Sequence, residues 1–198
     1  MKVTIRQYYT SFKGLYLLWA CVPFVTLLLH AFKLDSHSII ELYPPLGDFQ
    51  TYAMAATVGL LLVATFVVFL CCGLAKGIHP SVPVILMVGI VLGVCALIAL
   101  YVPFVRRIPI PSQSLEISVS IGYQRTDFAL TNYPKSNDWE MLHDRGPWEE
   151  QIQMLWTLHS IVVVRVLLWF FHTLALTCFL SVASLAVYQH AADALRVK

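Results

Sequence analysis

The stretch "SIVVVRVLLWFFHTL", residues 160–174, decides the fold. It places Arg165 and His172 inside a run that is otherwise almost wholly apolar. A helix of this composition is hydrophobic on every face, which is typical of a helix in a bilayer and not of one at the surface of a soluble domain. A charged side chain is costly in that setting, so Arg165 needs an explanation of its own.

The composition of the whole chain also indicates a membrane protein. It is 59% hydrophobic and 12% charged, against roughly 45–50% and about 25% in soluble domains. Four apolar segments, at 14–32, 51–75, 81–105 and about 158–188, are each close to the roughly 20 residues that cross a bilayer. The first is longer than the core of a signal peptide and has no small-residue cleavage site after it. We therefore predict an all-α membrane protein with four transmembrane helices and a small extracytoplasmic α+β segment between the third and the fourth.

The charges that flank the spans predict the orientation. The pieces assigned to one side carry basic residues close to the spans and a single acid, Asp193. These basic residues are Lys2, Arg6, Lys13, Lys76, Arg196 and Lys198. Short cytoplasmic loops are enriched in Lys and Arg, so both ends of the chain are expected in the cytoplasm.

Three regions follow from this topology: 1–105 with the first three spans, 106–157 outside the membrane, and 158–198 with the last span and a tail. The outer region begins with "RRIPIPSQS", whose prolines favour an extended chain. Residues 115–124 then alternate between apolar and polar, which predicts a β-strand. Its apolar residues are Leu115, Ile117, Val119, Ile121 and Tyr123.

One strand cannot bury its own face, so this strand needs a partner. Candidates are residues 128–133, the loop at 33–50, or the same strand of a second subunit, which would make the outer region an assembly device. Further along, a short helix is expected at 138–143, and a helix from about Trp148 could run continuously into the last span. Trp139, Trp148 and Trp156 suit an aromatic belt at the membrane surface.

Polar and small residues within the spans are the candidate functional residues. Arg165 and His172 are spaced so that they lie within about 20° of each other on one helix face, and His159 lies at the outer mouth of the span. Either Arg165 snorkels to headgroups or pairs structurally, or this face lines a polar seam or pore. Gly89 and Gly93 form a small-xxx-small pair that allows close helix packing, within the subunit or between subunits.

No nucleotide-binding loop, zinc-protease motif or nucleophile elbow occurs, so we predict no enzymatic activity and no cofactor. The five cysteines all fall in apolar segments without metal-ligand spacing, which predicts no metal site. Glu140, His143 and Asp144 are close in sequence, but a solvated polar surface is the expected role. Basic residues are too sparse for direct nucleic-acid binding.

In length, in its four spans and in having both ends inside, the chain resembles the small membrane subunit of the Kiwa anti-phage defence system. This resemblance implies a bacterial inner membrane, a homo-oligomer and a cytoplasmic DNA-binding effector protein as partner; it carries no functional residue over. Bacteriocin immunity proteins are similar in size and span number. The preferred function is a sensor or anchor subunit in the membrane, and the alternatives are a gated ion channel effector and a toxin immunity protein.

Overall fold

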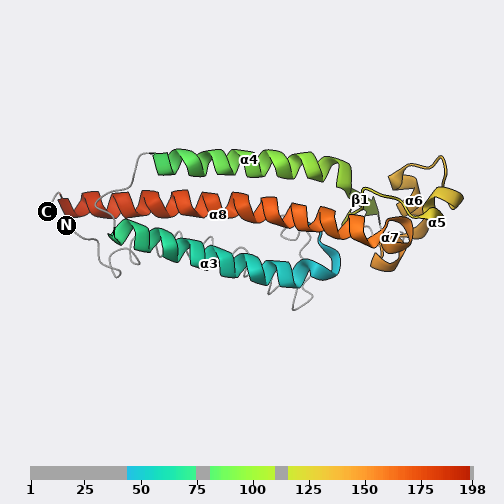
Figure 1. The fold of residues 1–198 in the computed structure, drawn as a ribbon, viewed down its shortest axis with the longest axis horizontal. Helices are drawn as coiled ribbons and strands as arrows, with labels where there is room; N and C mark the ends of the chain where they lie inside the picture. The colour runs from blue at the N-terminus through green and yellow to red at the C-terminus, as the bar shows by residue number, and fades with distance from the viewer. Residues whose placement is uncertain (1–43, 75–80, 110–115, 197–198) are drawn as a thin grey trace. The chain divides into compact units, whose positions relative to one another are not determined.

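The computed structural model describes residues 44–74, 81–109 and 116–196, and its elements are mostly helical. The first predicted span at 14–32, the loop up to residue 43 and Leu115 lie outside the described residues. Three long helices dominate: α3 (Gln50–Leu74), α4 (Ser81–Phe104) and α8 (Leu158–Arg196), as Figure 1 shows. A short 3-10 helix, η1 (Gly47–Phe49), precedes α3.

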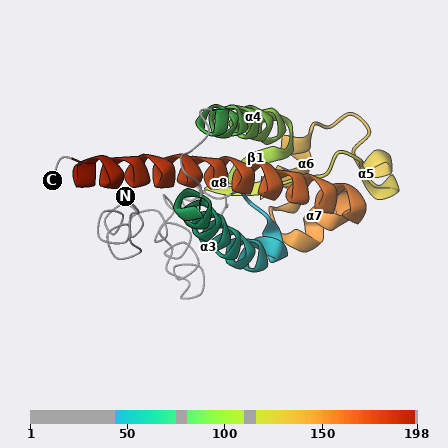
Figure 2. The ribbon, with the colours of Figure 1, turned by 60° about the vertical axis from the view of Figure 1, so that its left-hand side comes forward.

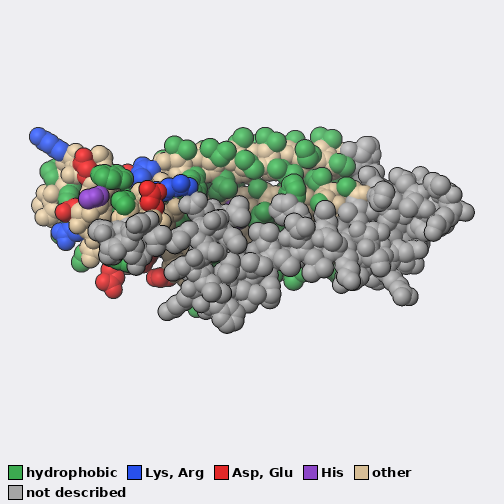
Figure 3. Space-filling view, turned by 180° about the vertical axis from the view of Figure 1, so that it is seen from behind, with side chains coloured by type: hydrophobic (Ala, Val, Ile, Leu, Met, Phe, Trp, Pro, Cys, Tyr) green, Lys and Arg blue, Asp and Glu red, His purple; other side chains and the backbone are tan. Residues whose placement is uncertain are grey.

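Each of these three helices contains a segment that is long and apolar enough to cross a membrane, at Gly47–Val68, Ser81–Phe104 and Leu158–Ala186. Most of the large apolar side chains of α4 are exposed, and its visible surface is hydrophobic along its length in Figure 3. Such a surface is unfavourable in water and satisfied in lipid. The second, third and fourth predicted spans therefore coincide with helices of the structure.

The chain divides into two compact units. One contains Met54–Val94 and α8 from Thr173 onward. In this unit Gly89 and Gly93 of α4 face α8, because a Cβ on Gly93 would lie 3.1 Å from the Cβ of Ala175 and one on Gly89 would lie 2.7 Å from the Sγ of Cys178. The buried hydroxyls of Thr57 and Thr173 lie 3.1 Å apart and hydrogen-bond α3 to α8.

The second unit contains Cys95–His172 and the described residues up to Ala53. It includes a small subdomain, residues 105–109 and 116–157, which we call the head. Lys, Arg, Asp and Glu side chains gather over the head in Figure 3. The head therefore has the polar surface that α4 lacks.

The head contains a two-stranded antiparallel sheet of β1 (Val105–Pro109) and β2 (Glu116–Ser120). Val105 lies opposite Ser120, and Pro109 lies opposite Glu116. Within the described residues, the partner of the predicted strand is thus the extended segment that leaves α4, which was not among the candidates considered above. Residues 128–133 overlap α5 (Asp127–Asn132) instead, because the Thr126 hydroxyl accepts the Ala129 N–H at 3.2 Å and starts a helix there.

The predicted strand is also too long at its end. After Ser120 the chain turns to run beside the segment that precedes α8. Thr126 N–H donates to the Leu155 carbonyl at 3.0 Å, and Thr157 N–H donates to the Gln124 carbonyl at 2.9 Å. These bonds replace strand pairing.

Two further helices complete the head, α6 (Asp138–Arg145) and α7 (Glu149–Leu155). Both ribbon views place α6 beside α7 and near β1 (Figures 1 and 2). The helix expected at 138–143 is α6, which begins with a reciprocal capping box between Asn137 and Glu140. Continuity from Trp148 into the last span is wrong, because α7 ends at Leu155 and α8 begins at Leu158.

The break between α7 and α8 is filled by a core residue. Trp156 is 2% exposed and forms an isolated backbone bridge with Arg125. Its ring belongs to the apolar core of the head, with side chains from the sheet and from α5 to α8. Trp156 is therefore not part of an aromatic belt, whereas Trp139 and Trp148 are exposed.

The close approach of α4 to α8 gives a test of the packing at Gly93. We expect Gly93→Leu to lower the free energy of unfolding in detergent by about 1–3 kcal/mol, because the new side chain meets the backbone of Ala175. Gly59→Leu on α3 is the matched control, since a Cβ at Gly59 has no atom within 4 Å. Thermal melts of the two variants measure the difference, and equal melts would argue against this packing.

Candidate functional site

Arg165 lies in the apolar part of α8, seven residues after the helix begins at Leu158. That spacing places its Cα about 10 Å along the helix axis. The side chain is only 4% exposed. A guanidinium cannot lose its proton in a protein, so burial requires acceptors close by.

Two elements of the head supply these acceptors. Glu149, the first residue of α7, accepts two parallel bonds, from Nη1 at 2.7 Å and from Nη2 at 2.8 Å. Ser120, the last residue of β2, accepts from Nε at 2.9 Å through its buried hydroxyl. Parallel bonds of this kind are among the strongest side-chain interactions, because both charge and geometry match.

A tight turn brings the start of α3 against this pair. Gly47 has a φ of 58°, a left-handed conformation that favours glycine. A Cβ at this position would lie 2.6 Å from both Nη1 of Arg165 and Oε2 of Glu149. Glycine is required here for its backbone conformation and for the space that the ion pair occupies.

The environment keeps Glu149 ionised. Burial raises its pKa, while the hydrogen bonds and the positive charge of Arg165 lower it, and a hydrogen bond from Gln153 lowers it further. The pKa of Glu149 ends below its ordinary value. The site is thus a part-buried ion pair: the Arg165 side chain is 4% exposed and the Glu149 side chain 22%, and the buried guanidinium depends on the carboxylate for its counter-charge.

The two predicted companions of Arg165 are not part of this pair. His172 shares its helix face with Arg165 and is half-buried, while His159 near the start of α8 is exposed. The bonds of Arg165 to described residues go to Glu149 and Ser120. The structure therefore brings Arg165 to the head and not to either histidine.

Most of the described apolar residues of the predicted strand pack inside the head. Val119 and Ile121 are buried in the core of the head, and Ile117 packs partly against it. Tyr123, beyond the end of β2, is 53% exposed. Of the described members of this set, Tyr123 is the one with a large outward surface.

Sequence reasoning missed Glu149 and Ser120. The unpaired charge of Arg165 in an apolar run indicates that an acidic residue lies nearby. The sequence does not show whether that residue is Glu149 or Glu150. It also missed a second cluster, in which Arg106 and Arg125 both pair with Asp138. In the described ranges, no group of three metal-ligating side chains gathers.

Comparisons with family models, with curated proteins and with solved structures find no match to this chain. What the fold defines is a largely helical chain with three candidate membrane-spanning helices and a small two-stranded sheet. Its main polar site ties the head to α8. An arginine, a glutamate and a serine hydroxyl make up this site. Their bonds link the position of α8 to the positions of α7 and β2.

The ion pair predicts an asymmetry between two neighbouring carboxylates. We expect Glu149→Gln to destabilise the fold by about 3–5 kcal/mol, because it leaves the buried guanidinium without a counter-charge. Glu150→Gln, at an exposed position, should change stability by less than about 0.5 kcal/mol. Denaturant titration in detergent measures both, and similar losses in the two variants would contradict the assignment.

The lowered pKa of Glu149 gives a second prediction. A group with a depressed folded-state pKa stabilises the fold above its ordinary value, near about 4.3, and this contribution is lost as pH falls through the lower folded-state pKa. We expect the melting temperature of the wild type to fall more steeply below about pH 5 than that of Glu149→Gln. Glu150→Gln should follow the wild type; identical slopes in all three proteins would refute the coupling.

Proposed function

We propose that the chain is a non-enzymatic membrane protein that acts as a sensor or anchor subunit. In this proposal four transmembrane helices cross a bacterial inner membrane, the head lies outside between the third and the fourth, and both termini lie in the cytoplasm. The observation that carries the proposal is the ion pair from the buried Arg165 of α8 to Glu149 of the head.

The ion pair connects the head directly to α8, a candidate membrane helix. The contact joins α8 to both α7 and β2, so a stimulus that displaces α7 has to expose or re-pair a buried charge. An element with two such arrangements can convert a contact outside the membrane into a change of helix position. Within the second unit α8 runs from Leu158 to His172, so a displacement of Arg165 acts directly on the helix that contains it.

The head also has side chains suited to contact with another molecule. Tyr123, Trp139 and Trp148 are 53%, 46% and 59% exposed. Tyr and Trp are enriched in recognition surfaces because they combine a large apolar area with a polar tip. These residues support a role in which the head detects something outside the membrane.

Assembly and a cytoplasmic partner complete the proposal. The chain is small, so we propose that it works as a homo-oligomer and that its basic cytoplasmic ends hold a protein partner. The overall plan supports a place in anti-phage defence through its resemblance to the Kiwa membrane subunit. A gated channel and an immunity protein remain the alternatives. Because the Arg165 guanidinium is bonded to Glu149 and Ser120, the sensor is favoured over a pore lined by Arg165.

Native mass spectrometry and bilayer conductance test this function together. We expect a stable homo-oligomer in mild detergent. We also expect no steady conductance in liposomes, because Arg165 of the last span is held by Glu149 and Ser120. His172→Ala and Arg165→Ala should leave the liposomes silent. A monomer would contradict the assembled sensor, and a conductance altered by either substitution would replace it with the channel.

A further inference from the structure

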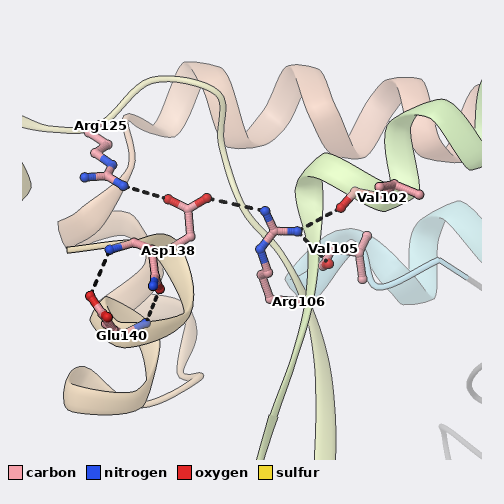
Figure 4. Close-up of polar contacts among 7 residues, drawn as sticks. Val102, Val105, Arg106, Arg125, Asp138 and Glu140 are labelled. Carbon is pink, nitrogen blue, oxygen red and sulfur yellow. Dashed lines mark hydrogen bonds and ion pairs between the residues drawn. The ribbon is translucent and has the colours of Figure 1, made fainter. Parts of the chain in front are cut away.

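Two arginines of the head converge on one carboxylate, as Figure 4 shows. Arg125 Nη2 lies 3.0 Å from Oδ1 of Asp138, and Arg106 Nη2 lies 3.5 Å from Oδ2. The three side chains are each 27% or 28% exposed, so solvent and small groups reach them. This cluster is separate from the ion pair of Arg165.

The Asp138 carboxylate lies at the capped N-terminal end of α6. Asp138 is the first residue of α6, and the capping box fixes that end of the helix. The Asn137 side chain accepts from Glu140 N–H at 2.9 Å, and Glu140 accepts from Asn137 N–H at 3.0 Å (Figure 4). The Asp138 side chain that both guanidiniums contact therefore extends from a capped helix end.

Both arginines are attached to the ends of candidate membrane spans. Arg106 follows α4 by two residues, and its Nη1 donates back to the carbonyls of Val102 at 2.9 Å and Val105 at 3.2 Å. Its guanidinium thus lies level with the last turn of α4. The backbone of Arg125 bridges Trp156, two residues before α8 begins. If α4 and α8 cross a bilayer, the cluster lies at the depth of the lipid headgroups.

The cluster has more positive charge and more donors than Asp138 can use. Two guanidiniums face one carboxylate, which leaves a net positive charge. Each guanidinium has five N–H donors in a planar fork. Among the described residues, the one side-chain bond of Arg125 is that to Asp138, and Arg106 keeps its Nε free of partners.

We propose that Arg106 and Arg125, bridged by Asp138, bind the phosphate of an anionic lipid headgroup beside the outer ends of α4 and α8. Arginine suits this ligand because its fork matches the oxygens of a phosphate. The site would hold the head at a fixed height and orientation on the bilayer. The proposal rests on the membrane-spanning part of the proposed function and not on sensing.

A purely structural bridge between β1 and α6 is the competing explanation, and Asp138 separates the two. Asp138→Asn removes the competing carboxylate charge and releases both guanidiniums. A lipid site then binds phosphate more tightly, whereas a structural bridge only loses stability. The two explanations thus predict different results for lipid binding in the same variant.

The experiment uses the full chain in nanodiscs of phosphatidylcholine with a minor fraction of phosphatidylglycerol, and native mass spectrometry counts the lipids that stay bound. We expect Arg125→Gln and Arg106→Gln each to weaken phosphatidylglycerol retention about fivefold, as expected for one basic residue at an anionic surface. Asp138→Asn should increase retention at least about twofold by the same electrostatic argument. Arg145→Gln is the control, because Arg145 is exposed and stacks on Phe128, so retention should not change.

Several outcomes would overturn the site. Equal phosphatidylglycerol retention by the wild type and by a folded Arg125→Gln is one, and weaker retention by Asp138→Asn is another. If Arg106→Gln does not fold, Arg125→Lys, which keeps the charge but not the fork, should give an intermediate loss. Arg125-dependent binding of inorganic phosphate in discs of pure phosphatidylcholine, without a preference for phosphatidylglycerol, would assign a soluble anion and overturn the lipid. Failure of the chain to enter nanodiscs would contradict the membrane proposal instead.

Discussion

The structure of the second unit depends on one constraint, which is that a permanent positive charge is buried in an apolar helix. Arg165 is 4% exposed in α8, and water does not satisfy it. Glu149 has to meet it, which fixes the start of α7, and Ser120 has to meet it, which fixes the end of β2. The left-handed turn at Gly47 leaves the room that these side chains need. Four segments far apart in the sequence are thus arranged around one guanidinium.

This constraint separates two kinds of charge cluster in the same unit. In the Arg165 pair the charges balance and the guanidinium is buried, so the pair holds the head to α8, and removing one partner is costly. The Arg106, Asp138 and Arg125 cluster is partly exposed and has surplus positive charge, so it has capacity for a further anion. In the proposed sensor, the Arg165 pair would couple the head to α8, and the Arg106, Asp138 and Arg125 cluster would bind the lipid phosphate.

The sequence predicts much of the framework and little of the site. The candidate spans at 51–75, 81–105 and 158–188 follow from their length and hydrophobicity, and α3, α4 and α8 occupy them. The alternation from Ile117 to Ile121 predicts a strand but does not identify the strand that pairs with it. That partner is β1, which precedes β2 closely in the sequence. The break at Trp156 was missed because its cause is a backbone bridge to Arg125, which lies 31 residues earlier in the numbering. The charge of Arg165 predicts that an acidic side chain lies close to it. Glu149 and Glu150 are adjacent in the sequence, and only the orientation of α7 determines which of them reaches Arg165.

A double-mutant cycle between Arg165 and Glu149 tests the central claim most directly. The free energy of unfolding is measured in detergent for the wild type, Arg165→Met, Glu149→Gln and the double variant. The ion pair predicts that removing Arg165 rescues the Glu149→Gln protein, with a coupling energy of about 2–3 kcal/mol. Additive losses in the double variant, with a coupling energy within about 0.5 kcal/mol of zero, would show that the two side chains act independently and would contradict the account.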